Sequence, residues 1–406
     1  MEIKDWSALI FQAGGKDWWI SFLMRKKEKI WNLVSSSGRF LRRAKNRGRF
    51  AFSGMQRRCR VRRIMELINK RKQDHLEIAL TGNGIDRQRG YFDQIQLRHR
   101  ALPEIDLKAV DTRVEFMGKE LSFPLLLSSM TGGAGEELAR INQNLAQGAE
   151  AAGVALAVGS QRVLLSDESA RSSFELRRYA PSILLLSNLG AVQLNDGVDA
   201  QGCERLVREM GADGICLHLN PLQEAIQPEG DTNFFGLTQK IAAVVRELKV
   251  PVLVKEVGSG ILPEDLKRLL DAGVRYVDVA GSGGTSWSQI ESQRSRDPKL
   301  GALFADWGIP TPQALRLAKP FLNRLELVAS GGIRNGLDMV KSLVLGASVC
   351  GMALPFLKPA QESPEAVRDA INRVRKEFSI AMFLLGAQRV DEIKNNEELL
   401  LNESGD

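Results

Sequence analysis

Eight short apolar runs constrain the fold of this chain more than any other feature. They span residues 125–130, 155–160, 183–189, 214–220, 251–257, 276–282, 326–332 and 348–354. Because each run is short, continuously apolar and followed by glycine or polar residues, we expect buried parallel strands. Helical patterns separate them, for example at 136–152, 235–248, 263–272 and 337–346. Eight alternating β and α units favour an α/β fold of the (β/α)8 barrel type, with an open doubly wound sheet as the alternative.

The first 64 residues differ in charge from the rest of the chain. They contain 17 Lys and Arg against 4 Asp and Glu, whereas the remainder contains 39 against 45. We therefore divide the chain into a basic N-terminal extension, 1–64, and a barrel domain, 65–406. Such an extension suits binding to nucleic acid or an anionic membrane, or organelle targeting. Its composition favours a flexible tail, or a translation start upstream of the native one, with Met55 and Met65 as alternatives.

Several classes of protein are excluded by what the sequence lacks. No run of 18 apolar residues occurs, so we expect no membrane span. The four cysteines form no CxxC pair, which argues against a zinc ribbon or a disulfide framework and indicates a cytoplasmic protein. The three histidines show no HxH or HExxH spacing, which argues against a histidine-metal hydrolase.

Polar or glycine-rich segments follow nearly every predicted strand. In barrels the C-terminal strand ends form the active site, so these segments predict one large ligand pocket. The seventh and eighth runs end in Ser-Gly-Gly-Ile-Arg (330–334) and Gly-Met-Ala (351–353). Glycines at these two ends let backbone N–H groups approach a phosphate, and Thr285, after the sixth run, offers a hydroxyl.

Charged residues suggest a second anion site and a metal site. Arg71, Lys72 and His75 precede the barrel and form either a solvated helix face or a segment that captures a polyanion. Arg162, at the end of the second run, is placed to reach the same anion. Glu224, after the fourth run, is the natural carboxylate ligand for Mg²⁺, which prefers one or two carboxylates together with phosphate oxygens.

Three further residues each have two interpretations. Lys255 ends the fifth run and is either a Schiff-base former or a fixed positive charge beside an electron-rich ring. His218, on the fourth run, faces either the pocket or the core. Trp307 lines a hydrocarbon pocket or simply packs.

Taken together, the motifs from about residue 70 to 386 resemble the type 2 isopentenyl-diphosphate isomerases, which are flavin enzymes with a (β/α)8 barrel. The matching segments occur in family order: RKQDH (71–75), HRALPE (99–104), SMTGG (129–133), SQR (160–162), HLNPLQE (218–224) and DWGIPT (306–311). The resemblance does not cover the N-terminal extension.

The resemblance implies three sets of site residues. FMN would be held by Ser129, Met130, Thr131, Ser160, Asn188, Lys255, Thr285, Gly331, Gly332, Arg334, Met352 and Ala353. The diphosphate would be held by Arg71, Lys72, His75, Ser160, Gln161, Arg162 and Gln223, with Mg²⁺ on Glu224. Catalytic roles would fall to Gln223, Lys255 and His218.

The implied reaction interconverts isopentenyl and dimethylallyl diphosphate by a 1,3-proton shift. An alkene is a weak base, so its protonation needs a strong acid in a dry pocket. Gln223 is a poor acid and Glu224 is committed to metal, so the resemblance implies reduced FMN as the acid–base group and Lys255 as its electrostatic partner. It also implies NADPH as the reductant and a homo-oligomer of four or eight subunits, with no nucleic-acid partner.

An FMN-dependent α-hydroxy-acid oxidase is the main alternative, because such enzymes share the barrel and the flavin site. That chemistry needs a His–Arg pair after the seventh strand. Here the seventh run reads Leu327-Val328-Ala329 before Ser330, and no histidine accompanies Arg334.

Overall fold

The computed structural model describes residues 74–81, 85, 91–129, 131–132, 135–165 and 168–401. The predicted N-terminal extension, 1–64, lies outside the described residues. The same is true of Arg71, Lys72 and Met130.

Eight parallel strands close into a barrel. They are β3 (Leu125–Leu127), β4 (Ala155–Ala157), β5 (Leu185–Gly190), β6 (Gly214–Leu219), β7 (Val252–Glu256), β8 (Tyr276–Asp278), β9 (Glu326–Ser330) and β10 (Val349–Met352). Each strand pairs with the next one along the chain, and β10 pairs with β3 to complete the ring. The predicted barrel is confirmed and the open-sheet alternative is wrong. Every strand overlaps one of the eight apolar runs, because a strand buried on both faces needs apolar residues throughout.

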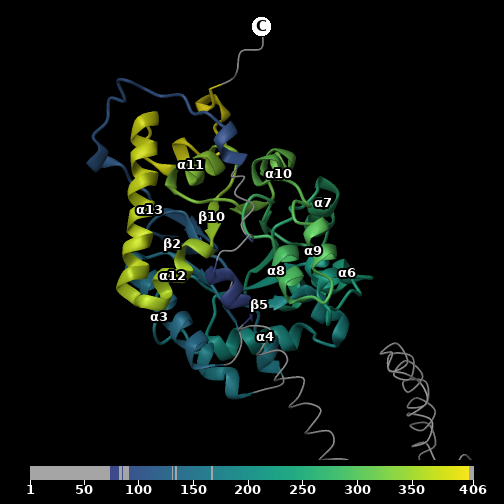
Figure 1. The fold of residues 1–406 in the computed structure, drawn as a ribbon. Helices are drawn as coiled ribbons and strands as arrows, with labels where there is room; N and C mark the ends of the chain where they lie inside the picture. The colour runs from purple at the N-terminus through teal and green to yellow at the C-terminus, as the bar shows by residue number, and fades with distance from the viewer. Residues whose placement is uncertain are drawn as a thin grey trace, which may run out of the picture. The chain divides into compact units, whose positions relative to one another are not determined.

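Helices surround the strands (Figure 1). They are α3 (Glu136–Ala152), α4 (Ala200–Met210), α5 (Pro221–Ile226), α6 (Leu237–Glu247), α7 (Pro263–Asp271), α8 (Trp287–Arg294), α9 (Pro298–Leu303), α10 (Thr311–Ala318), α11 (Gly336–Val344), α12 (Leu354–Glu362) and α13 (Pro364–Leu385). The long helix α13 runs along one side of the barrel, where it packs against α3, α11 and α12. Its start follows ordinary capping chemistry: the Ser363 hydroxyl accepts the Ala366 backbone N–H, and Pro364 opens the first turn.

Short 3-10 helices form much of the remaining chain. They are η1 (Tyr91–Gln94), η2 (Leu107–Ala109), η3 (Arg162–Leu165), η4 (Glu168–Ser173), η5 (Ala191–Asp196), η6 (Lys319–Phe321), η7 (Val390–Glu392) and η8 (Glu397–Leu399). Residues 74–81 are also helical. Among the described helices, none combines the length and the apolar composition needed to cross a bilayer.

An antiparallel hairpin that the sequence analysis missed closes one end of the barrel. It consists of β1 (Val114–Phe116) and β2 (Lys119–Leu121). Phe116, Met117 and Leu121 are buried in a cluster with inward-facing residues of the strands, including Leu186 and Val349. Met117 also lies beside Gly214, the first residue of β6, so the hairpin covers the N-terminal strand ends. The hairpin does not cover the C-terminal ends of the barrel strands, where a ligand site can form.

Candidate active site

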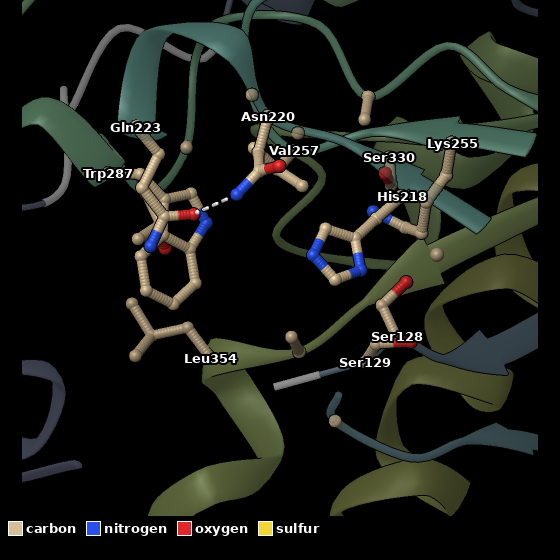
Figure 2. A pocket seen from close by; sticks show the side chains of 18 of the residues that line it. Ser128, Ser129, His218, Asn220, Gln223, Lys255, Val257, Trp287, Ser330 and Leu354 are labelled. Atoms are coloured by element: carbon tan, nitrogen blue, oxygen red, sulfur yellow. Dashed lines mark hydrogen bonds between the residues drawn. The ribbon is translucent and has the colours of Figure 1, made fainter. Parts of the chain in front are cut away.

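A cavity of about 360 Å³ lies at the C-terminal ends of the barrel strands (Figure 2). It brings together most of the residues that the sequence analysis proposed for FMN: Ser129, Ser160, Asn188, Lys255, Thr285, Gly331, Gly332, Arg334, Met352 and Ala353. The proposed substrate, metal and catalytic residues His75, Arg162, His218, Gln223 and Glu224 line the same cavity. Its size and mixed lining are typical of a small-molecule site.

Three proposed residues have other surroundings. Gln161 is fully buried outside the cavity, where its Oε1 accepts the Asn188 backbone N–H at 3.0 Å; it therefore supports the end of β5 instead of reaching substrate. The Thr131 hydroxyl is bonded to the Asn142 amide, and the residue lines a smaller adjoining cavity. Trp307 is 62% exposed and packs against Phe304, so it is not the aromatic residue of this cavity.

Glycines allow the loops after β8 and β9 to meet backbone to backbone. Gly331 and Gly332 have φ of +91° and +80°, a region that disfavours residues with a Cβ. A Cβ on Gly331 would overlap the Gly281 carbonyl oxygen, and one on Gly332 would lie 2.8 Å from the Gly283 carbonyl carbon. The Arg334 guanidinium bridges the two loops, because it donates to the Gly332 and Gly283 carbonyl oxygens at 3.1 and 3.0 Å. The arrangement fits the predicted phosphate site.

Gly331→Ala should damage this loop pair far more than a glycine substitution of equal backbone cost. Gly197 has a similar φ of +93°, but no atom lies within 4 Å of the position that a Cβ would take there, so Gly197→Ala is the matched control. The control should lose about 1–2 kcal/mol of stability from the left-handed backbone alone. Gly331→Ala should in addition lose at least about tenfold in FMN affinity, since the clash moves the loop. Equal FMN affinity in the two variants, measured by fluorescence titration, would contradict the assignment.

Lys255 is held at one side of the cavity by buried acceptors. Its Nζ donates to the Glu256 carbonyl oxygen at 2.6 Å and lies 3.7 Å from Asp278 Oδ2. Asp278 is completely buried and accepts the Ser330 hydroxyl at 2.7 Å. Burial raises the pKa of Asp278, and the charge of Lys255 and the Ser330 hydrogen bond oppose that rise. An ammonium with a buried carboxylate behind it suits a fixed positive charge better than a Schiff-base nucleophile, which must be neutral.

His218 lines the cavity between its two sides (Figure 2). Its Nδ1 lies 2.8 Å from Asn188 Oδ1, and because an amide oxygen only accepts, Nδ1 carries the proton in this contact. Gln161 fixes Asn188 from behind. This chain of contacts orients the imidazole toward the cavity, which settles its two interpretations in favour of the pocket.

On the other side, oxygen ligands gather around Glu224. Its Oε1 accepts the Asn220 side-chain N–H at 2.9 Å, and its Oε2 accepts the Asp231 backbone N–H at 2.6 Å. Asn220 Oδ1 is buried and has no hydrogen-bond partner among the described residues. A carboxylate beside an unsatisfied amide oxygen is the kind of donor set that Mg²⁺ prefers, so the residues fit the predicted metal.

The sequence analysis missed a buried acid behind Gln223. Glu291, on α8, is fully buried, and its Oε1 accepts Gln223 Nε2 and contacts His75 Nε2, both at 2.9 Å. Its Oε2 accepts Arg294 Nη1 at 2.6 Å. Burial alone would raise the pKa of Glu291, but the hydrogen bonds from His75 and Gln223 and the charge of Arg294 lower it from the usual 4.5 to about 2. The carboxylate is therefore ionised, and it holds His75 Nε2 and Gln223 Nε2, which fixes both side chains in the wall of the cavity.

The sequence contained one usable signal for Glu291. It follows Trp287 by four residues, which places both on one face of α8, and Trp287 lines the cavity. Figure 2 shows the Trp287 indole beside Gln223, with Leu354 below it, and Val257 borders the same space. Trp287 thus supplies the apolar wall that the sequence analysis sought in Trp307.

Comparison with known proteins gives the family. The model for FMN-dependent dehydrogenases matches residues 68–179 and 220–400. The isopentenyl-diphosphate delta-isomerase of Paracoccus zeaxanthinifaciens is 55% identical over 336 residues, which cover 81% of this chain and 96% of that protein. The chain belongs to the isopentenyl-diphosphate delta-isomerase family. The family protein of Hydrogenovibrio crunogenus is 50% identical, over 82% of this chain and 98% of its own length.

Solved structures of other flavoproteins share the fold of this isopentenyl-diphosphate delta-isomerase family member. Mandelate oxidase matches with a TM-score of 0.54 and 20% identity, over 75% of this chain and 88% of its own. The flavin-binding domain of baker's yeast flavocytochrome b2 matches with a TM-score of 0.57 and 19% identity, over 78% and 79%. At these identities the likeness concerns the barrel alone.

The cavity fits the FMN that the family description names. Gly284, Gly331 and Gly332, in the loops after β8 and β9, line the cavity, and glycines let a phosphate approach the backbone closely; Lys255 offers a positive charge near the strand ends. Between them, the buried Ser128 hydroxyl faces the cavity with no hydrogen-bond partner among the described residues. Buried polar atoms are almost always satisfied in native proteins, so this hydroxyl indicates a polar ligand.

Proposed function

We propose that this protein interconverts isopentenyl and dimethylallyl diphosphate by a 1,3-proton shift, with FMN and Mg²⁺. The observation that carries the proposal is that the residues of two predicted anion sites line one cavity. The glycine loops around Gly331 would form one, and Arg162, with Mg²⁺ on Glu224, would form the other. A hydroxy-acid oxidase would also bind an anion, the substrate carboxylate, but it would need a histidine base beside that site. The three histidines of the sequence are residues 75, 99 and 218, so none follows β9 to act as an oxidase base.

Each side of the cavity would have its own task. Arg162 and Mg²⁺ on Glu224 would hold the diphosphate, and the wall around Trp287 would take the isoprene chain and exclude water. Gln223 and His75, held by Glu291, would orient the substrate. Bound FMN, in its reduced form, would supply the acid–base chemistry at carbon. Lys255 would compensate the negative charge of the reduced ring at close range in a dry site.

Anaerobic turnover tests this proposal. Isopentenyl diphosphate and Mg²⁺ are incubated with the oxidised and with the dithionite-reduced protein, and dimethylallyl diphosphate is followed by NMR. We expect product only with reduced flavin and no net consumption of reductant. Lactate and mandelate, offered aerobically, should give no hydrogen peroxide. Equal turnover with both flavin forms would show that a protein group such as His218 performs the proton transfer, and oxidation of a hydroxy acid without isomerisation would favour the oxidase.

The reductant and the assembly state belong to the same proposal. We expect NADPH to reduce the bound flavin slowly and the protein to form a tetramer or an octamer, as the family resemblance implies. Stopped-flow absorbance with NADPH and NADH, and sedimentation velocity, measure the two properties.

Glu224→Gln should weaken metal-dependent turnover by at least about tenfold. The substitution keeps the shape but removes the anionic ligand, and about 1.4 kcal/mol is a floor for a charged contact. The apparent affinity for Mg²⁺ should fall with it. Glu229→Gln, in the segment that follows α5, is the control for removal of a nearby surface charge and should leave the Mg²⁺ dependence unaltered. An unchanged Mg²⁺ titration in Glu224→Gln would remove this residue from the metal site.

A further inference from the structure

The proposed diphosphate-binding arginine already has an anionic partner within the chain. Arg162 Nη1 donates to Asp231 Oδ2 at 2.6 Å, and Gln193 Nε2 donates to the same oxygen at 3.2 Å. Arg162 and Gln193 both line the cavity. A diphosphate that approaches the Arg162 guanidinium therefore competes with the Asp231 carboxylate for Nη1.

Asp231 is also connected to the proposed metal ligand. Its backbone N–H donates to Glu224 Oε2 at 2.6 Å. The turn before it is tight, since a Cβ on Gly230 would overlap the Glu224 carbonyl oxygen. The fold therefore builds one short connection, Arg162 to Asp231 to Glu224, between the anion site and the metal site.

This connection has opposite consequences with and without a metal ion. Without metal, an arriving diphosphate meets the carboxylates of Glu224 and Asp231 and competes with Asp231 for the Arg162 guanidinium. With Mg²⁺ on Glu224, the added positive charge offsets this repulsion. The Asp231 carboxylate stays near Glu224 through its backbone N–H, so the added positive charge would also offset the cost of its displacement from Arg162.

We propose that Asp231 is a specificity-determining residue that makes diphosphate binding conditional on Mg²⁺. In the absence of ligand its carboxylate pairs with the Arg162 guanidinium, so an anion that arrives without a divalent cation binds with lower affinity. The proposal rests on the proposed diphosphate site, and the experiment below separates failure of the one from failure of the other.

Isothermal titration calorimetry with inorganic pyrophosphate tests the proposal. The FMN-loaded full chain is titrated in EDTA and in excess Mg²⁺, as wild type and as Asp231→Asn, which keeps the shape and the backbone contact. In EDTA the variant should bind pyrophosphate at least about fivefold more tightly, because a charge-assisted competitor for Arg162 is gone. In Mg²⁺ its affinity should stay equal or fall. The Mg²⁺-dependent gain in affinity therefore shrinks by at least about fivefold.

Two controls separate this competition from general repulsion. Asp196 is a mostly exposed residue near the pair. Partial desolvation and the charge of Asp231 raise the pKa of Asp196, and the charge of Arg162 opposes that rise. Among the described residues, however, the carboxylate that forms an ion pair with Arg162 is that of Asp231. Asp196→Asn should leave the metal-free affinity near the wild-type value. In an Arg162→Gln background the gain from Asp231→Asn should disappear, since the pair must be intact for the competition to exist.

The outcomes are distinct. An unchanged metal-free affinity in Asp231→Asn, an equal gain in Asp196→Asn, or a gain that persists without Arg162 overturns the role of Asp231. A wild-type protein that binds pyrophosphate in neither buffer contradicts the proposed diphosphate site instead. Thermal melting of each variant checks the fold, and Asp231→Ser, also neutral, replaces Asp231→Asn if the latter does not fold.

Discussion

Lys255→Met should abolish most of the activity and weaken reduced FMN more than oxidised FMN. The substitution removes the ammonium but keeps a chain of similar length, and we expect turnover to fall by about 100-fold or more, the usual loss for one preorganised electrostatic partner. Reduction adds negative charge to the flavin, so loss of the Lys255 charge should weaken the binding of reduced FMN more than the binding of oxidised FMN. Anaerobic titration of the apoprotein with each flavin form measures this difference independently of turnover.

Asp278 provides the control for this prediction. It is completely buried beside Lys255, and the loss of one partner from such a pair destabilises a protein by about 3–5 kcal/mol. The double variant Lys255→Met, Asp278→Asn removes both charges and should recover much of the thermal stability. It should not recover the preference for reduced FMN. If both flavin forms lose affinity equally in the single and the double variant, Lys255 acts through the fold and not on the flavin charge.

Glu291→Gln should lower turnover by about 100-fold, the loss that a substrate misplaced by about 1 Å can cause. The carboxylate receives Gln223, His75 and Arg294, and a glutamine offers one oxygen where three donors converge. We expect the loss in both kcat and KM, because Gln223 and His75, which Glu291 holds, would orient the substrate. Glu229→Gln is the matched control, since it removes a different carboxylate from Arg294, whose Nη2 lies 3.3 Å from Glu229 Oε1. A similar loss in both variants would assign the effect to Arg294.

The pH dependence of stability offers a separate readout of Glu291. Its pKa is lower in the folded protein, about 2, than the usual 4.5, so its ionised form stabilises the fold above pH 4.5. That contribution is lost as the pH falls from 4.5 toward 2. The variant lacks this contribution, so its free energy of unfolding should decline less steeply than that of the wild type over this interval. Chemical denaturation at a series of pH values measures the slope.

The barrel could be predicted from the sequence because its determinants are local. A strand buried on both faces must be apolar throughout, and a parallel strand must be followed by a long return connection, so eight apolar runs separated by helical patterns left few arrangements. The strand ends then converge by geometry alone. This is why residues as distant in sequence as Ser129, Lys255 and Gly331 could be assigned to one site. The hairpin β1–β2 was missed because its three-residue strands carry charged residues and give no periodic signal.

Only the tertiary structure decided which acidic side chain contacts which site residue. Glu291 lies 68 residues from Gln223, and Asp231 lies 69 from Arg162, yet each pair is in hydrogen-bond contact. No local pattern shows what these acids contact, because a buried carboxylate and a solvated one look alike in sequence until packing sets their burial and partners. Strand polarity and glycine positions fixed where the site would lie, whereas the charges that orient Gln223, hold Lys255 and compete for Arg162 depend on contacts between separate loops.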